Sequence, residues 1–211
     1  MVVSEHSLTC TPYIYMRPKK YSDEDLLSLT RTCLLREGGH ISTQVIADEL
    51  GVSQAMLFKR FGTKNKLLCS ALSPSNRIRS LLAVLAAEPS SDPVLKQLSE
   101  RCRVVLEFYN FMVPGWTILH ALGLKTTNHC NEERPPVQAR KAMTKWVAAL
   151  QQRGRIRTCY AESTALALIG SMQHRAFRRH ILNDLTMQES DSNFIQSTVE
   201  LFWLGLMPRG E

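Results

Sequence analysis

The sequence lacks the features that mark membrane proteins and secreted, disulfide-stabilised proteins. No apolar run approaches the roughly 18 residues that a membrane-spanning helix needs. The stretch from Met1 to Tyr15 mixes charged residues and proline with apolar ones and does not follow the layout of a secretion signal. The six cysteines include no CxxC pair and are too scattered for a disulfide scaffold. We therefore expect reduced thiols in a cytoplasmic protein without a membrane partner.

The sequence also has little that would support catalysis or metal binding. No nucleophile, paired carboxylates or glycine-rich phosphate loop occurs with the spacing or the neighbouring strand that such chemistry needs. The pair His129-Cys130 lacks the two further ligands of a zinc site. The sequence therefore predicts no enzyme, no cofactor and no metal site.

The composition predicts a globular protein with an anionic partner. The 211 residues are 44% hydrophobic, which is enough for a sizeable core in one or two domains. A net charge of +7 favours a polyanion over an acidic metabolite as the partner. We expect a flexible arm over residues 1–19, a first domain over residues 20–73 and a second over residues 74–211. A second methionine, Met16, precedes Arg17-Pro-Lys-Lys20, and the structured protein is expected to start near it.

Caps, glycines and prolines predict an all-α fold of about nine helices, without strands or repeats. Ser22 and Asp25 form a capping-box pattern, and Gly38-Gly39 ends the helix that it opens. Ser42 or Thr43 then caps a helix whose buried residues are expected to include Val45, Ile46 and Leu50. Gly51 ends this second helix. Ser53 caps a third over residues 54–61, and Thr63 caps a fourth.

The remaining helices follow from proline positions and apolar periodicity. Asp92 with Pro93 reads as a cap followed by proline at the first helical position. This helix should run to Val113 and end at Pro114-Gly115, which break helices. Further helices are expected over residues 116–124, 137–153, 161–182 and 193–206, with a polar loop over residues 125–135.

The segment from Ser42 to Lys64 carries the strongest functional signal. Two short helices joined at a glycine turn form a helix-turn-helix, which lets the second helix enter the major groove of DNA. That helix ends in Lys59 and Arg60, and residues 53–66 contain four basic and no acidic side chains. Such a run also occurs as an ordinary solvated surface.

The spacing within residues 26–72 is specific: Thr43, Ile46-Ala47, Gly51-Val52-Ser53, Leu57-Phe58, Phe61, Lys64 and Leu67-Leu68. This pattern resembles the N-terminal domain of the tetracycline-repressor (TetR) family of bacterial transcription regulators. The resemblance implies that DNA is contacted by Thr43, Ser53, Gln54, Ala55, Met56, Phe58, Lys59, Arg60 and Lys64. The family usually has tyrosine at Phe58, and its hydroxyl commonly reaches a phosphate. We therefore expect this chain to rely more on Lys59, Arg60 and Lys64.

Each implied contact has a physical basis. Thr43 and Ser53 lie at helix N-termini, where backbone N–H groups and a hydroxyl can hold phosphate. Gln54 has the donor and acceptor to pair with adenine, and Ala55 or Met56 can touch a thymine methyl group. Lys64 would bind backbone phosphate.

For the second domain, the resemblance implies a homodimer held by the last two long helices, and a small-molecule effector. The apolar faces of these helices also fit packing within one subunit. Aromatic and methionine side chains make adaptable ligand walls, although they equally build plain core. The ligand candidates are Phe108, Phe111, Met112, Trp116, His120, Met143, Trp146 and Met172. His120 would either orient a polar ligand group or be a satisfied core histidine.

The sequence thus predicts a ligand-responsive transcription regulator, a repressor released from a palindromic operator by its effector. Within the same class, the alternatives are an activator or a protein that coats DNA. From a different class, the alternative is an all-helical ligand-binding or interaction protein whose DNA-reading head has degenerated. A DNA-reading protein should lose affinity steeply with salt, whereas such a carrier should show little DNA affinity.

Overall fold

The computed structural model describes residues 21–72, 75–124 and 135–208, and in these it is all-α with nine helices and no strand. The helices are α1 (Asp23–Glu37), α2 (Thr43–Leu50), α3 (Gln54–Phe61), α4 (Lys64–Leu72), α5 (Ser75–Ala86), α6 (Val94–Ala121), α7 (Pro135–Gln152), α8 (Ala161–His180) and α9 (Asp191–Leu206). The all-α prediction is confirmed. Among these helices, none is long and apolar enough to cross a membrane. The predicted arm and polar loop, Met16, Pro74 and the His129-Cys130 pair lie outside the described residues.

Local capping fixes the first four helices as the sequence predicts. The Ser22 hydroxyl accepts from the Asp25 backbone N–H at 3.1 Å, while the Asp25 carboxylate accepts from the Ser22 N–H at 3.0 Å. Ser42, rather than Thr43, caps α2, and Ser53 caps α3. Gly51 adopts a left-handed φ of 65°, which residues with a Cβ find costly. The expected burial of Val45 is wrong, because its side chain is 45% exposed.

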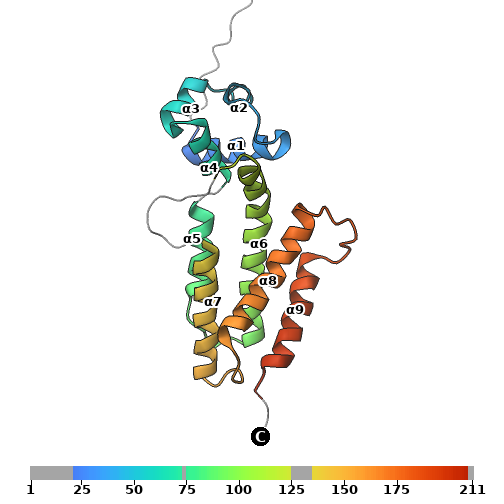
Figure 1. Cartoon of the computed structure of the whole chain (residues 1–211). Coiled ribbons are helices and arrows are strands. Elements are labelled where there is room, and N and C mark those ends of the chain that lie inside the picture. The colour runs from blue at the N-terminus through green and yellow to red at the C-terminus, as the bar shows by residue number, and fades with distance from the viewer. Residues whose placement is uncertain (1–20, 73–74, 125–134, 209–211) are drawn as a thin grey trace, which may run out of the picture.

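Two apolar cores divide the described residues. The first core joins α1 to α4 and includes one residue of α6, Leu119. The second core joins α5 to α9. Figure 1 shows α1 to α4 gathered at one end of the molecule and α5 to α9 extending from them. The limits of the two domains stay a prediction, since the expected boundary falls at residues 73–74, outside the described residues.

The expected break at Pro114 is wrong, because α6 continues through it to Ala121. An internal proline removes one backbone hydrogen bond and costs about 3 kcal/mol. Packing of the second half of α6 offsets this cost, since Leu119 is buried in the first core and Ile118 and Leu122 pack against it. Arg31 of α1 also donates to the Phe111 carbonyl, one turn before the proline.

Two further differences concern the helices flanking residue 90. Pro93 itself is the cap of α6, and Asp92 pairs with Lys96 instead of capping. The sequence-based prediction names no separate helix at the position of α5. The described residues nevertheless form nine helices, as predicted. The additional helix α5 makes up for the two predicted helices, before and after Pro114, that are one helix, α6, in the structure.

Gly115 sets how closely α6 approaches the end of α4. A Cβ at this position would lie 2.8 Å from the Leu72 carbonyl oxygen and 3.1 Å from Nη1 of Arg31. Because the carbonyl is a backbone atom, it cannot rotate away. We expect Gly115→Ala to lower the free energy of unfolding by about 1–3 kcal/mol, measured by urea denaturation. Gly205→Ala is the control, since a Cβ there meets nothing within 4 Å. Equal stability of the two variants would contradict the close contact.

Charged groups tie α8 to the start of α9. Asp191 accepts from Nε of Arg175 at 2.7 Å and from both terminal nitrogens of Arg179, at 2.6 and 2.8 Å. These arginines lower the pKa of Asp191 from 3.8 to about 2, with Arg179 the larger cause. Arg175 is buried and also stacks on the Phe194 ring, 4.5 Å from its centroid.

The lowered pKa of Asp191 predicts a pH-dependent contribution to stability. A depressed folded-state pKa stabilises the protein above the ordinary value of 3.8, and this contribution is lost as the pH falls toward 2. We expect Asp191→Asn to cost about 1 kcal/mol at pH 7, because the side chain is partly exposed and screened by solvent. The difference from wild type should shrink as the pH falls from 4 through 2 in thermal melts. A constant difference across the whole pH range would contradict this origin.

Candidate nucleic-acid interface

The helix α3 stands out from the first core. Of its eight residues, Leu57 alone is buried, while Met56 and Phe61 pack partly against the core. Figure 1 shows α2 and α3 at the end of the molecule opposite the C-terminus. The left-handed turn at Gly51 joins these two helices. This arrangement leaves most of α3 open to a large partner.

The predicted contact residues all lie at this end of the molecule. They differ in how far they are exposed. Ser53, Ala55, Phe58 and Lys59 are exposed, whereas Gln54, Met56 and Lys64 are partly buried. Thr43 is buried at the first position of α2, and the exposed hydroxyl at this N-terminus belongs to Ser42. Contacts of these residues with DNA stay predictions.

The cations of this surface do not form a uniform group. Arg60 donates to the Tyr21 carbonyl at 2.8 Å and pairs with Asp23 at 3.1 Å, so it holds the start of α1. Lys64 donates to the Ile41 carbonyl at 2.5 Å, ahead of α2. Lys59 and Lys66 are exposed, and neither makes an ion pair within the described residues. Lys59 is therefore the predicted contact whose charge is available to a partner.

The sequence-based site omits Lys66, although the lack of acidic residues over positions 53–66 includes it. Its backbone N–H donates to the Thr63 hydroxyl at 3.3 Å, which fixes the first turn of α4. Together Lys59 and Lys66 place two available positive charges on neighbouring helices. A cationic surface of this kind suits the phosphate backbone of a nucleic acid.

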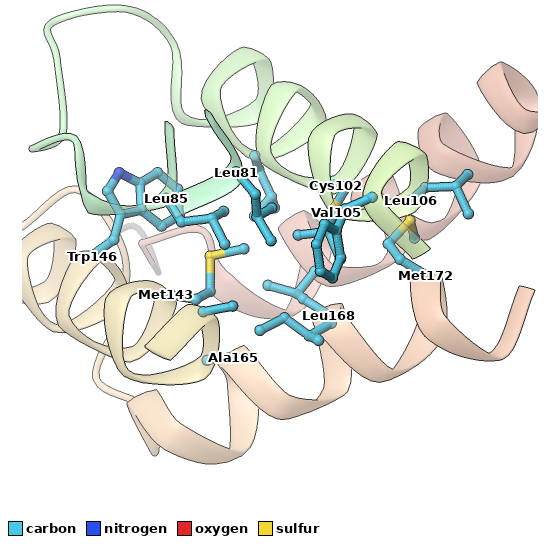
Figure 2. Close-up of a cluster of buried hydrophobic side chains, with 14 of the residues drawn as sticks. Leu81, Leu85, Cys102, Val105, Leu106, Met143, Trp146, Ala165, Leu168 and Met172 are labelled. Atoms are coloured by element: carbon cyan, nitrogen blue, oxygen red, sulfur yellow. The ribbon is translucent and has the colours of Figure 1, made fainter. Parts of the chain in front are cut away.

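Seven of the eight ligand candidates belong to the second core or pack against it. Met112, Met143 and Met172 are fully buried, and Phe108 and Trp146 nearly so. Phe111 and Trp116 lie at the margin of this core. Figure 2 shows the part of the cluster that contains Met143, Trp146 and Met172. Ligand binding by any of these side chains stays a prediction.

His120 does not join this cluster. It is exposed near the end of α6, between residues that pack against the first core. The expectation of a satisfied core histidine is therefore wrong. The amphipathic period of α6 explains the error, because the helix turns His120 outward where its neighbour Leu119 turns inward.

Arg31 connects the two cores. Its guanidinium lies 3.6 Å from the centroid of the Phe111 ring and donates to the Leu72 carbonyl at 3.3 Å. The side chain is buried, with 8% exposed. The sequence alone does not reveal this role, because nothing in the pattern of α1 distinguishes Arg31 from an exposed arginine.

No protein-family model matches the sequence, and neither does any curated protein. Solved structures do match its fold. PfmR, a TetR-family transcriptional regulator from Thermus thermophilus, has a TM-score of 0.63 at 16% identity, over 83% of this chain and 95% of its own. A TetR-family regulator from Pectobacterium atrosepticum has a TM-score of 0.54 at 18% identity, over 88% and 94%. A TetR variant from Acinetobacter baumannii AYE in complex with minocycline has 0.51 at 16% identity, over 87% and 97%.

Proposed function

We propose that this chain, which has the fold of TetR-family transcriptional regulators, is a DNA-binding regulator of transcription. The observation that carries the proposal is α3, an exposed helix at one end of the fold that carries the available charge of Lys59. Such a helix fits the major groove, while the serine-capped N-termini of α2 and α3 suit phosphate. Because the proposed partner is chromosomal DNA, the proposed site of action is the cytoplasm.

The proposal includes a homodimer formed through α8 and α9. Leu166, Phe177 and Ile181 of the α8 region are exposed apolar side chains, 49%, 41% and 38% exposed. Gly170 lies on the same side, and a Cβ there would meet nothing within its own chain. A glycine inside a helix lowers stability by about 0.5–1 kcal/mol relative to alanine. A close helix–helix contact with a second copy would explain why glycine occupies this position. On α9, Leu201 and Leu204 are 70% and 67% exposed.

Two copies related by a two-fold axis would present two α3 helices to a palindromic operator, about one DNA turn apart. An effector in the second core would favour one separation of the reading heads over another. It shifts operator affinity only by its differential affinity for the two conformations. The helix α6 supplies residues to both cores, which gives this coupling a physical route. Minocycline binding by the Acinetobacter baumannii protein supports a ligand-responsive role. Effector-released repression is the form of regulation that we propose.

A salt titration tests the proposed function. Purified protein should bind fragments of the organism's own DNA, and the logarithm of the affinity should fall linearly with that of the salt concentration. An all-helical ligand carrier with a degenerate reading head is the competing function, favoured by the intramolecular bonds of Arg60 and Lys64. Absence of DNA binding at low salt would support the carrier and contradict the regulator.

A further inference from the structure

Arg101, on the first half of α6, is a buried cation with few partners. The side chain is 5% exposed, and its Nη2 donates to the Ala87 carbonyl at 2.7 Å. Its guanidinium carbon lies 4.1 Å from the centroid of the Trp146 ring on α7. Within the described part of the chain, Arg101 forms no ion pair, and its Nε has no acceptor. Burial lowers its pKa from 12.5 to about 10.

Trp146 supplies a second donor of the same kind. Its indole Nε1 is buried and has no acceptor among the described residues. Because Arg101 stacks on the Trp146 ring, two unused donors belong to one pair of side chains in contact. Buried donors in proteins are nearly always paired, and a buried charge is costly without an opposite charge.

The same fold shows how a buried arginine is otherwise neutralised. Arg175 is as deeply buried as Arg101 and also stacks on an aromatic ring, that of Phe194. However, Arg175 donates to the carboxylate of Asp191 at 2.7 Å and lies 4.0 Å from that of Glu189. Arg101 has the burial and the stacking but not the carboxylate. Glu100 acts on Arg101 through its charge, but no carboxylate among the described residues accepts a hydrogen bond from the Arg101 guanidinium.

The surroundings of the pair favour an anion with an apolar body. Lys145 and Arg153 lie at the same end of the molecule, and both pair with one carboxylate, Glu88, at 3.7 and 3.1 Å. These two cations therefore share one carboxylate. On the other side, Figure 2 shows Trp146 beside Leu85, with Met143 next to them. An unbranched methionine can change rotamer to admit a ligand.

We propose that Arg101 and Trp146 form a subsite for the carboxylate of the effector, with the apolar part of the effector lying against Met143 and Leu85. This inference rests on the proposed function, because it names the chemical class of the ligand that the second core takes. A carboxylate would accept from Nε of Arg101 and from Nε1 of Trp146. The site differs from the Phe111–Trp116 end of α6, at the margin of the same core.

Isothermal titration calorimetry on the full chain tests the subsite. The probes are acetate, hexanoate and 4-phenylbutanoate, each with its neutral amide of the same shape. We expect at least one carboxylate with an apolar body to bind wild type about tenfold or more tightly than its amide, because hydrogen bonds to charged groups are the stronger ones. Arg101→Met, which keeps the length of the side chain and removes its charge, should abolish this preference.

Two variants complete the experiment. Trp146→Phe keeps a ring under Arg101 but removes the N–H, so it should weaken carboxylate binding about three- to tenfold and keep part of the preference. Arg157→Met, at an exposed position, is the matched control and should leave binding unchanged. Equal affinity for acid and amide, no binding of any probe, or an unchanged preference in Arg101→Met would overturn the subsite. DNA binding of the ligand-free protein is measured separately, so failure of the subsite is distinguishable from failure of the proposed function.

Discussion

Replacing Lys59 and Arg60 together by alanine is expected to weaken operator binding about 100-fold or more. Each lost contact with a base or a phosphate costs about 1–3 kcal/mol, and a dimer loses every contact twice. Lys59 should account for most of the effect, because Arg60 spends part of its hydrogen-bonding capacity on Tyr21 and Asp23. The single variant Lys59→Ala separates the two contributions. The dissociation constant is measured by fluorescence anisotropy over a range of salt concentrations.

The matched control for this prediction is Lys96→Ala with Arg157→Ala. It removes the same two residue types from exposed positions outside the α2–α3 head, and it lowers the net charge equally. If phosphate contacts are lost, the salt slope of the head variant should fall by about one unit per contact, whereas the control keeps the wild-type slope. Equal affinities of the two double variants would show that net charge, and not α3, governs DNA binding.

Replacing Leu201 and Leu204 together by glutamate is expected to convert the proposed dimer into a monomer. Both side chains are well exposed on α9, so the fold of the single chain should tolerate the change. In a dimer the four introduced carboxylates would lie in an apolar interface, where loss of a central residue costs about 2 kcal/mol or more. The dimer dissociation constant should rise at least about 1000-fold, measured by sedimentation velocity.

Operator binding supplies a second readout for the dimer. A monomer places one α3 on one half-site, so its affinity for a palindromic site should fall to that for half a site. Leu29→Glu with Leu35→Glu, at exposed positions of α1, is the control with the same substitutions, and it should remain dimeric. A dimeric Leu201→Glu, Leu204→Glu variant would place the interface elsewhere.

The head could be predicted residue by residue because its signals are local. A serine or threonine begins each helix and a glycine ends the first three, and the capping atoms of Ser22, Ser42 and Ser53 form the expected bonds. The failures have non-local causes. Pro114 reads as a helix end, but α6 continues because its second half is held by a core formed elsewhere in the chain.

The candidate sites divide in the same way. Exposure of Ala55, Phe58 and Lys59 follows from the period of a short helix over one core. The intramolecular bonds of Arg60 and Lys64 join segments more than twenty residues apart, and no spacing rule predicts them. Arg101 gives no signal in the sequence either, because its lack of an ion-pair partner among the described residues arises only in the folded chain.

Hydroxyl-radical footprinting on the DNA beside the protein's own gene tests the central claim most directly. The account predicts two protected segments, related by a two-fold axis and centred about 34 Å or one helical turn apart. Protection should disappear with Lys59→Ala plus Arg60→Ala and persist with the Lys96→Ala, Arg157→Ala control. An unprotected or uniformly protected fragment, or protection that survives loss of both α3 cations, would contradict the assignment of α3 as the DNA-reading helix.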